Sequence, residues 1–305
     1  MTAAALTAIV AVTAALPAPP GRLVDIGGRK LHLNCTGSGS PTVVLVAGGS
    51  AFAIDWTLVQ APLASSTRVC SYDRAGLGWS DDGPADETVE QTVGDLHALL
   101  QRAGERGPYV LVGASIGGIF IRAYQRAFPS DVAALVFSNS ANRVGLAASG
   151  ANGLLWSLSE DQIRSAFPFP PPPGPAPSRE GDPFDRLPAE LQAARLQFDV
   201  QLYEKIQRQS PASMLSWRKE FLREFDETES GTPPLGALPV VVISSDPIRA
   251  DASRSRDGLA ARRPLFSTNT TLVVAKGSGH EIHLYEPDTV VEAIRRLVIA
   301  LRATH

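Results

Sequence analysis

The sequence predicts an α/β protein whose parallel sheet is covered on both faces by helices. Short apolar stretches alternate with stretches of helical periodicity along the chain, and this order is typical of such a sheet. The chain has 305 residues, of which 44% are hydrophobic and 19% charged, so intrinsic disorder is excluded. Its length allows one large domain, or one domain with an added lobe.

Eight short apolar segments are expected to form the strands. They are residues 23–26, 31–34, 42–46, 68–72, 109–113, 132–137, 240–243 and 271–274. Residues 89–102 and 116–128 have the periodicity of helices that lie between strands. The last helix is expected to begin at Pro287, because proline fits a first helical turn and apolar residues follow at helical spacing.

The alternation of strands and helices is interrupted between residues 143 and 238, where no segment has the character of a strand. Seven of the ten residues 168–177 are proline, which predicts an extended and exposed linker. We therefore divide the chain after residue 20 into a sheet domain, residues 21–142 and 239–305, and an inserted helical segment, residues 143–238.

Two helices are expected after the proline-rich linker. Pro188 is placed to begin the first of them, and Ser210 is placed to cap the second. Apolar residues recur on one face of the first helix, at Leu191, Ala194, Phe198, Leu202 and Ile206. The inserted segment has no sheet of its own, so we expect this face to pack on the sheet domain.

Residues 1–20 have the character of a signal or anchor segment. An uncharged, alanine-rich stretch from Ala3 to Leu16 is followed by prolines and a glycine, which end any helix. Its length favours the apolar part of a secretory signal over a membrane-spanning helix, although no basic residue precedes it. We expect a protein that is exported or anchored on the outer side of a membrane. The alternative is a disordered tail on a cytoplasmic protein.

Charge and cysteine content narrow the classes of partner. The formal net charge is −3 and the basic residues are scattered, so the chain has no basic stripe for nucleic acid. The histidines and cysteines lack the spacing of a zinc site, and we expect neither a metal nor a cofactor. Cys35 and Cys70 lie in two predicted strands. They form a disulfide if those strands are neighbours in an exported protein, or two buried thiols otherwise.

The segment from Gly113 to Gly117 reads Gly-Ala-Ser-Ile-Gly and lies between a predicted strand and a predicted helix. In this position a G-x-S-x-G motif lifts the serine hydroxyl above the edge of the sheet on a strained turn. The glycines let neighbouring backbones pass closely. The N-terminus of the following helix directs its amides toward Ser115, which favours an oxyanion there.

From about residue 21 to residue 305 the chain resembles the α/β-hydrolase family. Residues 72–81, Tyr-Asp-Arg-Ala-Gly-Leu-Gly-Trp-Ser-Asp, are similar to the family's Y-D-x-x-G-x-G-x-S stretch. Residues 277–280, Gly-Ser-Gly-His, are similar to its G-x-G/A-H. Together with the serine motif, this resemblance implies a mostly parallel eight-stranded sheet with helices on both faces, and residues 143–238 as a helical cap.

The resemblance also implies roles for two residues in acyl transfer. Ser115 is expected to attack the substrate carbonyl as the nucleophile, and His280 to take its proton as the general base. His283 is the rival base, three residues later in the sequence. The glycine-rich turn favours His280, which leaves His283 as a structural or pocket residue.

An oxyanion hole needs two backbone donors, for which the resemblance points to Gly49 and Ile116. Gly49 lies in the loop after the third strand, where Ala47 replaces the family's histidine. This replacement removes a side-chain hydrogen bond that often stiffens the loop. Four aromatic residues are candidates either for an apolar acyl pocket or for the core: Phe52, Trp56, Trp79 and Trp217.

The third member of the triad is expected at Asp246, which follows the strand predicted at residues 240–243. Asp251 is the alternative acid. Some relatives carry the acid after the sixth strand, but Asn139 occupies that position here. An asparagine can orient the imidazole without stabilising its positive charge, so a triad without a carboxylate is a further alternative.

These residues predict a cofactor-independent serine hydrolase that cleaves a carboxylic ester, a lactone or a related small acyl substrate. Serine as the nucleophile argues against relatives that open epoxides or displace halide, because those need a carboxylate there. The same triad also serves hydrolysis of amide and carbon–carbon bonds, which are alternatives. The second hypothesis is a binding or signalling protein with reduced catalysis, which Ala47 and Asn139 favour.

Overall fold

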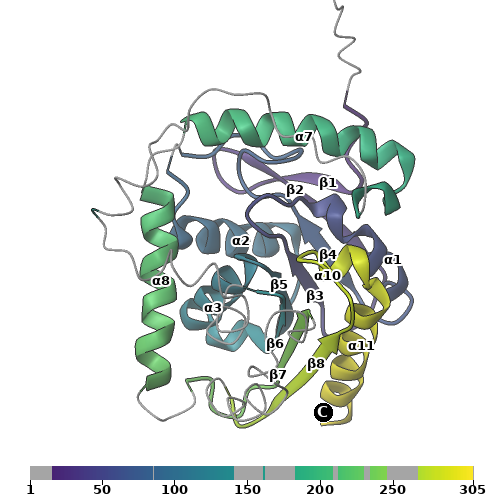
Figure 1. The fold of residues 1–305 in the computed structure, drawn as a ribbon, viewed down its shortest axis with the longest axis vertical. Coiled ribbons are helices and arrows are strands. Elements are labelled where there is room, and N and C mark those ends of the chain that lie inside the picture. Colours follow the sequence, from purple (N-terminus) through teal and green to yellow (C-terminus); the bar gives the residue numbers. More distant parts are fainter. Residues whose placement is uncertain are drawn as a thin grey trace, which may run out of the picture.

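One sheet of eight strands forms the centre of the molecule (Figure 1). Its strand order is β1-β2-β4-β3-β5-β6-β7-β8. β1 pairs antiparallel with β2, and β2 pairs antiparallel with β4, while all other neighbours are parallel. The structure is a computed structural model that describes residues 16–84, 86–140, 161, 183–208, 212–229, 234–245 and 267–304.

Each of the eight strands lies at a segment that the sequence predicts. Their bounds are β1 Arg22–Asp25, β2 Lys30–Thr36, β3 Val43–Val46, β4 Val69–Tyr72, β5 Tyr109–Ala114, β6 Val132–Ser138, β7 Val240–Ser245 and β8 Thr270–Ala275. The parallel strands are nearly continuous apolar runs because helices cover both of their faces. The predicted fold class is therefore confirmed.

β3 illustrates how the two faces of the sheet are built. Its four residues are buried. The side chains of Val44 and Val46 belong to one hydrophobic core, and those of Val43 and Leu45 belong to another on the opposite face. This alternation follows from the two-residue period of a strand.

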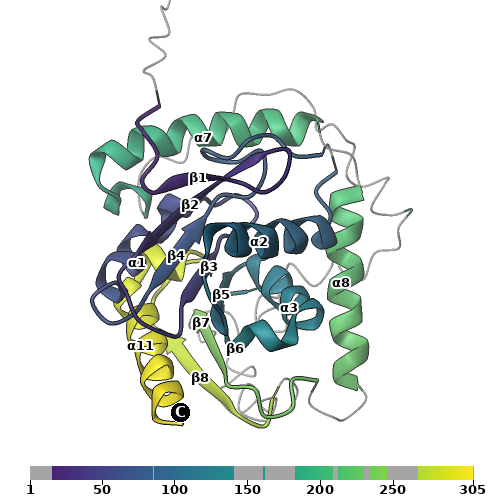
Figure 2. The ribbon, with the colours of Figure 1, turned by 180° about the vertical axis from the view of Figure 1, so that it is seen from behind.

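Helices cover both faces of the sheet (Figures 1 and 2). α2 (Val89–Ala103) and α3 (Gly117–Ala127) pack on one face. α1 (Thr57–Leu63) and α11 (Pro287–Ala303) pack on the other. Shorter helices within the described ranges are η1 Ala53–Trp56, η2 Pro129–Asp131, η3 Phe184–Arg186 and α10 Ile282–Tyr285.

The described residues of the inserted segment form two long helices, α7 (Ala189–Arg208) and α8 (Ala212–Glu229), as the sequence predicts. Figure 1 shows α7 across the end of the molecule near β1 and β2, with α8 along its side. The apolar face predicted for α7 is in contact with the sheet domain through a third hydrophobic cluster. Its buried members are Phe52, Ile54, Leu77, Ala194, Phe198 and Leu202.

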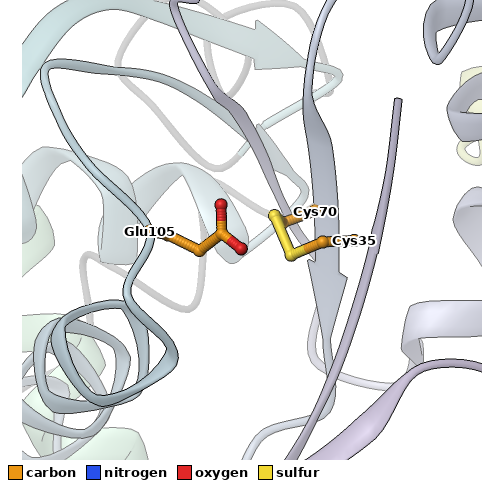
Figure 3. A group of neighbouring side chains, drawn as sticks. All are labelled: Cys35, Cys70 and Glu105. Atoms are coloured by element: carbon orange, nitrogen blue, oxygen red, sulfur yellow. A yellow bond between two sulfur atoms is a disulfide. The ribbon is translucent and has the colours of Figure 1, made fainter. Parts of the chain in front are cut away.

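Cys35 and Cys70 form a disulfide between β2 and β4, where they are directly opposite in the register (Figure 3). The sequence left open whether these cysteines form a disulfide or remain two buried thiols, and the disulfide is observed. Glu105 lies beside the two sulfur atoms, within 4.8 Å, but its carboxylate accepts hydrogen bonds of 3.0 and 2.7 Å from Arg68. With the sulfurs bonded to each other and the carboxylate paired, this trio serves the structure rather than a metal.

The described chain begins at Leu16, and its first residues lie against the sheet domain. The Trp79 side chain donates a hydrogen bond of 3.0 Å to the Pro17 carbonyl. Within the described ranges no helix combines the length and apolar character needed to cross a bilayer. The predicted signal segment up to residue 15 and the proline-rich linker, residues 168–177, lie outside those ranges.

Candidate functional site

Ser115 lies at the turn between β5 and α3 with a backbone φ of +50°. A positive φ is rare for a residue with a side chain and marks local strain of the kind found at functional sites. A Cβ on Gly113 would lie 2.5 Å from the Gly117 carbonyl oxygen, and a Cβ on Gly117 would lie 2.5 Å from that of Val46. Both glycines of the motif are therefore required by close backbone contacts.

The loop of residues 47–50 follows β3 and lies against this turn. A Cβ on Gly48 would be 3.2 Å from the Ser115 Cβ, and one on Gly49 would be 3.5 Å from the Ile116 Cγ2. The Arg74 guanidinium donates hydrogen bonds to the carbonyls of Ala47 (3.0 Å), Gly48 (2.9 Å) and Gly49 (3.0 Å). Arg195 donates to the next carbonyl, that of Ser50, at 3.0 Å.

Two backbone amides beside Ser115 have no hydrogen-bond partner among the described residues, those of Gly49 and Ile116. In a trans peptide the N–H points away from the C=O of the same unit. Because the Gly48 carbonyl accepts from Arg74, the Gly49 N–H points to the opposite side, away from the guanidinium. The two amides that the sequence predicts as donors are thus free to bind a ligand atom.

Each arginine belongs to a buried ion cluster that includes α7. Arg74 pairs with Glu87 (2.8 Å), and Lys205 of α7 pairs with the same carboxylate (3.0 Å). Arg195 of α7 pairs with Asp55 (2.8 Å) and with Asp199. Both guanidiniums and all three carboxylates are buried.

His280 follows β8 and its side chain is exposed. The Asn139 Nδ2 donates a hydrogen bond of 3.1 Å to the His280 carbonyl and lies 3.3 Å from the ring Nδ1. Asn139 itself has a φ of +42° at the end of β6, and the Ser245 hydroxyl donates to its Oδ1 at 3.4 Å. The residue at the sixth-strand position is therefore in contact with the predicted base, but it is an amide.

Ser115 and His280 line the same pocket. Among the described residues the serine hydroxyl forms no hydrogen bond with the imidazole. Such bonds are often long in a free enzyme and shorten when substrate binds, so the common pocket is the relevant observation. Asp246 and Asp251 lie outside the described residues, and the last described residue before them is Ser245 at the end of β7.

His283, on α10, also lines this pocket. Only 3% of it is exposed, and its ring stacks on Trp56 with 4.5 Å between centroids. Burial lowers the pKa of His283 to about 3, with His280 and Arg195 acting in the same direction. The ring is neutral at ordinary pH and is a weak base, which agrees with the sequence-based preference for His280.

The pocket that contains Ser115 is small, with a volume of about 30 Å³. The described residues that line it are Gly48, Gly49, Ser50, Ala51, Asp55, Ala114, Ser115, Phe184, His280, Glu281 and His283. None of the four candidate aromatic residues is among them. Phe52 and Trp56 are buried in the core, Trp79 packs on the α7 cluster, and Trp217 packs on the α3 side.

Sequence reasoning missed Asp55, Arg195 and Phe184, because tertiary packing alone brings them to the site. Asp55 lies in η1, where Arg195 and the Phe52 amide engage its two oxygens. Burial raises the pKa of Asp55 above its ordinary value, although Arg195 opposes this. The one signal in the local sequence was that Arg195 and Asp199 are four residues apart on a predicted helix, a spacing that allows an ion pair.

Comparison with known proteins adds the family context. A family model described as "Alpha/beta hydrolase family" matches residues 43–293. An "AB hydrolase superfamily protein" of Gibberella zeae is 24% identical over 86% of this chain and 87% of its own length. A protein of Hormonema carpetanum named "Probable transporter efuK" is 32% identical over 39% of this chain, but the match covers 18% of that protein. The chain thus spans a minor part of this relative.

Solved structures share the fold. The thermophilic esterase of Thermogutta terrifontis superposes with a TM-score of 0.61 at 22% identity, covering 90% of this chain and 94% of the esterase. A "putative lipase" of Acinetobacter baumannii superposes with a TM-score of 0.65 at 17% identity, covering 93% and 92%. At these identities the likeness establishes the architecture alone.

Proposed function

The chain belongs to the alpha/beta hydrolase family, and we propose that it is a serine hydrolase that cleaves a carboxylic ester, a lactone or a related small acyl substrate. One observation carries this proposal. Ser115 sits on a strained turn beside two amides that lack a hydrogen-bond partner among the described residues, and it shares a pocket with His280. A nucleophile, a base and two oxyanion donors are the groups that acyl transfer requires.

In the proposed reaction the Ser115 Oγ attacks the substrate carbonyl while His280 accepts the hydroxyl proton. The carbonyl oxygen becomes an oxyanion bound by the Gly49 and Ile116 amides. The bond to the leaving group then breaks, and His280 returns the proton to that group. Water attacks the acyl-serine by the same steps and releases the carboxylic acid. One oxyanion donor is typically worth about 10²- to 10³-fold in rate.

We propose Asp246 as the acid of the triad and keep Asp251 as the alternative. Asp246 follows Ser245 directly in the sequence, and the Ser245 hydroxyl contacts Asn139, which contacts His280. An acid at this place orients the ring so that Nδ1 carries a proton and Nε2 is free to accept one. Asn139 alone does not supply the negative charge.

We further propose that residues 143–238 act as a cap over the site. Phe184 lines the pocket. Arg186 donates a hydrogen bond of 2.7 Å to the carbonyl of Tyr285, the last residue of α10. The Cys35–Cys70 disulfide supports export or anchoring on the outer side of a membrane, because disulfides persist in oxidising compartments. The partner is a small acyl molecule, with no role for nucleic acid.

A second candidate is a binding protein with reduced catalysis, which one observation favours. If the Asn139 Nδ2 donates to the His280 Nδ1, the ring proton lies on Nε2, where it opposes transfer from serine. The ester hydrolase is preferred because a binding protein has no need of the strained Ser115 or of two unpartnered amides beside it. Amide or carbon–carbon bond hydrolysis would use the same residues.

The proposal is tested with p-nitrophenyl acetate and butyrate. Ser115→Ala and His280→Ala are expected to lower kcat by at least about 10³-fold. Asp246→Asn is expected to lower it by about 10⁴-fold and Asp251→Asn to have little effect. Ser65→Ala, on an exposed turn, is the matched control. A folded wild-type protein that hydrolyses no ester would favour the binding protein instead.

A further inference from the structure

His283 is a buried polar side chain that the proposed reaction does not use. Both of its ring nitrogens are buried and have no hydrogen-bond partner in the part of the chain that the structure describes. Buried polar groups are normally paired, since an unpaired one costs about 1–3 kcal/mol. His283 also lines the pocket of Ser115, so a substrate that enters the pocket can pair with it.

We propose that His283 is a specificity residue that binds a hydroxyl group on the acyl part of the substrate. This proposal rests on the proposed hydrolase and names its substrate class: short hydroxyacyl esters or lactones. A neutral imidazole has one N–H donor and one acceptor nitrogen, and a hydroxyl group can satisfy either of them. The stack on Trp56 fixes the ring, so the bond forms in one place.

The surroundings of His283 disfavour a charged substrate group. The same burial and the same nearby Arg195 that keep the imidazole uncharged also oppose an ammonium ion. Asp55 and Glu281 are among the residues that line the pocket, so an anion that enters it meets acidic residues. The Arg195 guanidinium is already engaged by Asp55, Asp199 and the Ser50 carbonyl. A neutral polar group fits this site.

The size of the pocket limits the length of the acyl group. A cavity needs about 10–15 Å³ for one water-sized group. The volume of about 30 Å³ therefore accommodates roughly two such groups. A short acyl chain that ends in a hydroxyl group suits this space better than a long alkyl chain.

The test compares methyl 3-hydroxypropanoate with methyl butanoate, which differ by a hydroxyl in place of a methyl group. Hydrolysis is followed by acid release at constant pH. Wild type is expected to prefer the hydroxy ester by about tenfold in kcat/KM. His283→Phe keeps the stacked ring but no hydrogen bond, and should abolish the preference. His283→Gln keeps an amide donor and acceptor and should restore part of it.

His97→Phe is the matched control. His97 also stacks on an aromatic ring, that of Phe128 at 3.8 Å, but it does not line the pocket, and the preference should be unchanged. A wild type without preference for the hydroxy ester would overturn the proposal without any variant. Equal loss of both activities in His283→Phe and His283→Gln would do so too, because it would assign His283 to the reaction itself.

Binding to the Ser115→Ala protein separates this proposal from the hydrolase. Calorimetric titration with the same two esters measures recognition in the absence of turnover. Tighter binding of the hydroxy ester, lost in the Ser115→Ala, His283→Phe double variant, supports the specificity role even if wild type cleaves neither ester. Equal binding of both esters contradicts it, whatever the outcome for catalysis.

Discussion

Two buried arginines fix the loop of residues 47–50, and they do so from different parts of the chain. Arg74 comes from the turn after β4 and donates to three successive carbonyls, whereas Arg195 comes from α7 and donates to the fourth. The sheet domain thus positions most of the loop by itself. The inserted helix adds one contact, which couples its own docking to the proposed oxyanion donor at Gly49.

The charges around the two arginines differ in balance. At Arg74 one carboxylate, Glu87, faces two cations. At Arg195 one cation faces two carboxylates, Asp55 and Asp199. Burial opposes ionisation of Glu87, but Arg74 and Lys205 outweigh it and lower its pKa. Burial raises the pKa of Asp55, and Arg195 does not compensate. The cluster of Arg74, Glu87 and Lys205 therefore stabilises its buried charges better than the cluster of Arg195, Asp55 and Asp199 does.

This comparison predicts that Arg195→Met causes the larger loss of stability. The substitution leaves two buried carboxylates without a cation, and breaking such a pair costs about 3–5 kcal/mol. Arg74→Met leaves Glu87 with Lys205 and is expected to cost about 1 kcal/mol less. Urea unfolding at pH 7 measures both values. Arg223→Met, a largely exposed residue of α8, controls for the loss of a surface arginine.

For activity, we predict the opposite order, with a larger loss in Arg74→Met than in Arg195→Met. Arg74→Met frees three loop carbonyls and should lower kcat for p-nitrophenyl acetate by about 100-fold, the typical effect of losing an oxyanion donor. Arg195→Met frees one carbonyl and should lower kcat by about tenfold. Arg74→Lys tests the geometry, because an ammonium cannot reach three carbonyls as a planar guanidinium does. If the Arg74 and Arg195 variants lowered kcat equally, Arg74 would not be the more important of the two arginines for positioning the loop.

The pH dependence of stability is the smallest expected effect. The pKa of Glu87 is lowered, so its contribution is present above its ordinary value of 4.5 and is lost as pH falls through the folded pKa. The pKa of Asp55 is raised, so its contribution is present below 3.8 and is lost as pH rises through the folded pKa. The cost of Glu87→Gln should therefore increase with pH, and that of Asp55→Asn should decrease. Unfolding midpoints from pH 3.5 to 7 would show whether the two slopes have opposite signs.

The fold was predictable because its signals are local. All eight strands could be read from apolar runs, and α7 from a periodic face that packs where expected. Ser115 and its glycines were equally readable, since a strained turn needs specific residue types in sequence order. The arginine clusters were not, because Asp55 and Arg195 are 140 residues apart and meet only through packing. Ala47 illustrates this. Its side chain cannot form the hydrogen bond that often stiffens this loop, and Arg74 and Arg195 hold the loop through its carbonyls instead.

Intact mass after treatment with a fluorophosphonate tests the central claim most directly. The account predicts one covalent adduct on wild type, none on Ser115→Ala, and much slower formation on His280→Ala, because the hydroxyl must lose its proton to the imidazole. Ser65→Ala should react like wild type. A folded wild-type protein that forms no adduct, or an adduct that persists in Ser115→Ala, would contradict the assignment of Ser115 as the nucleophile.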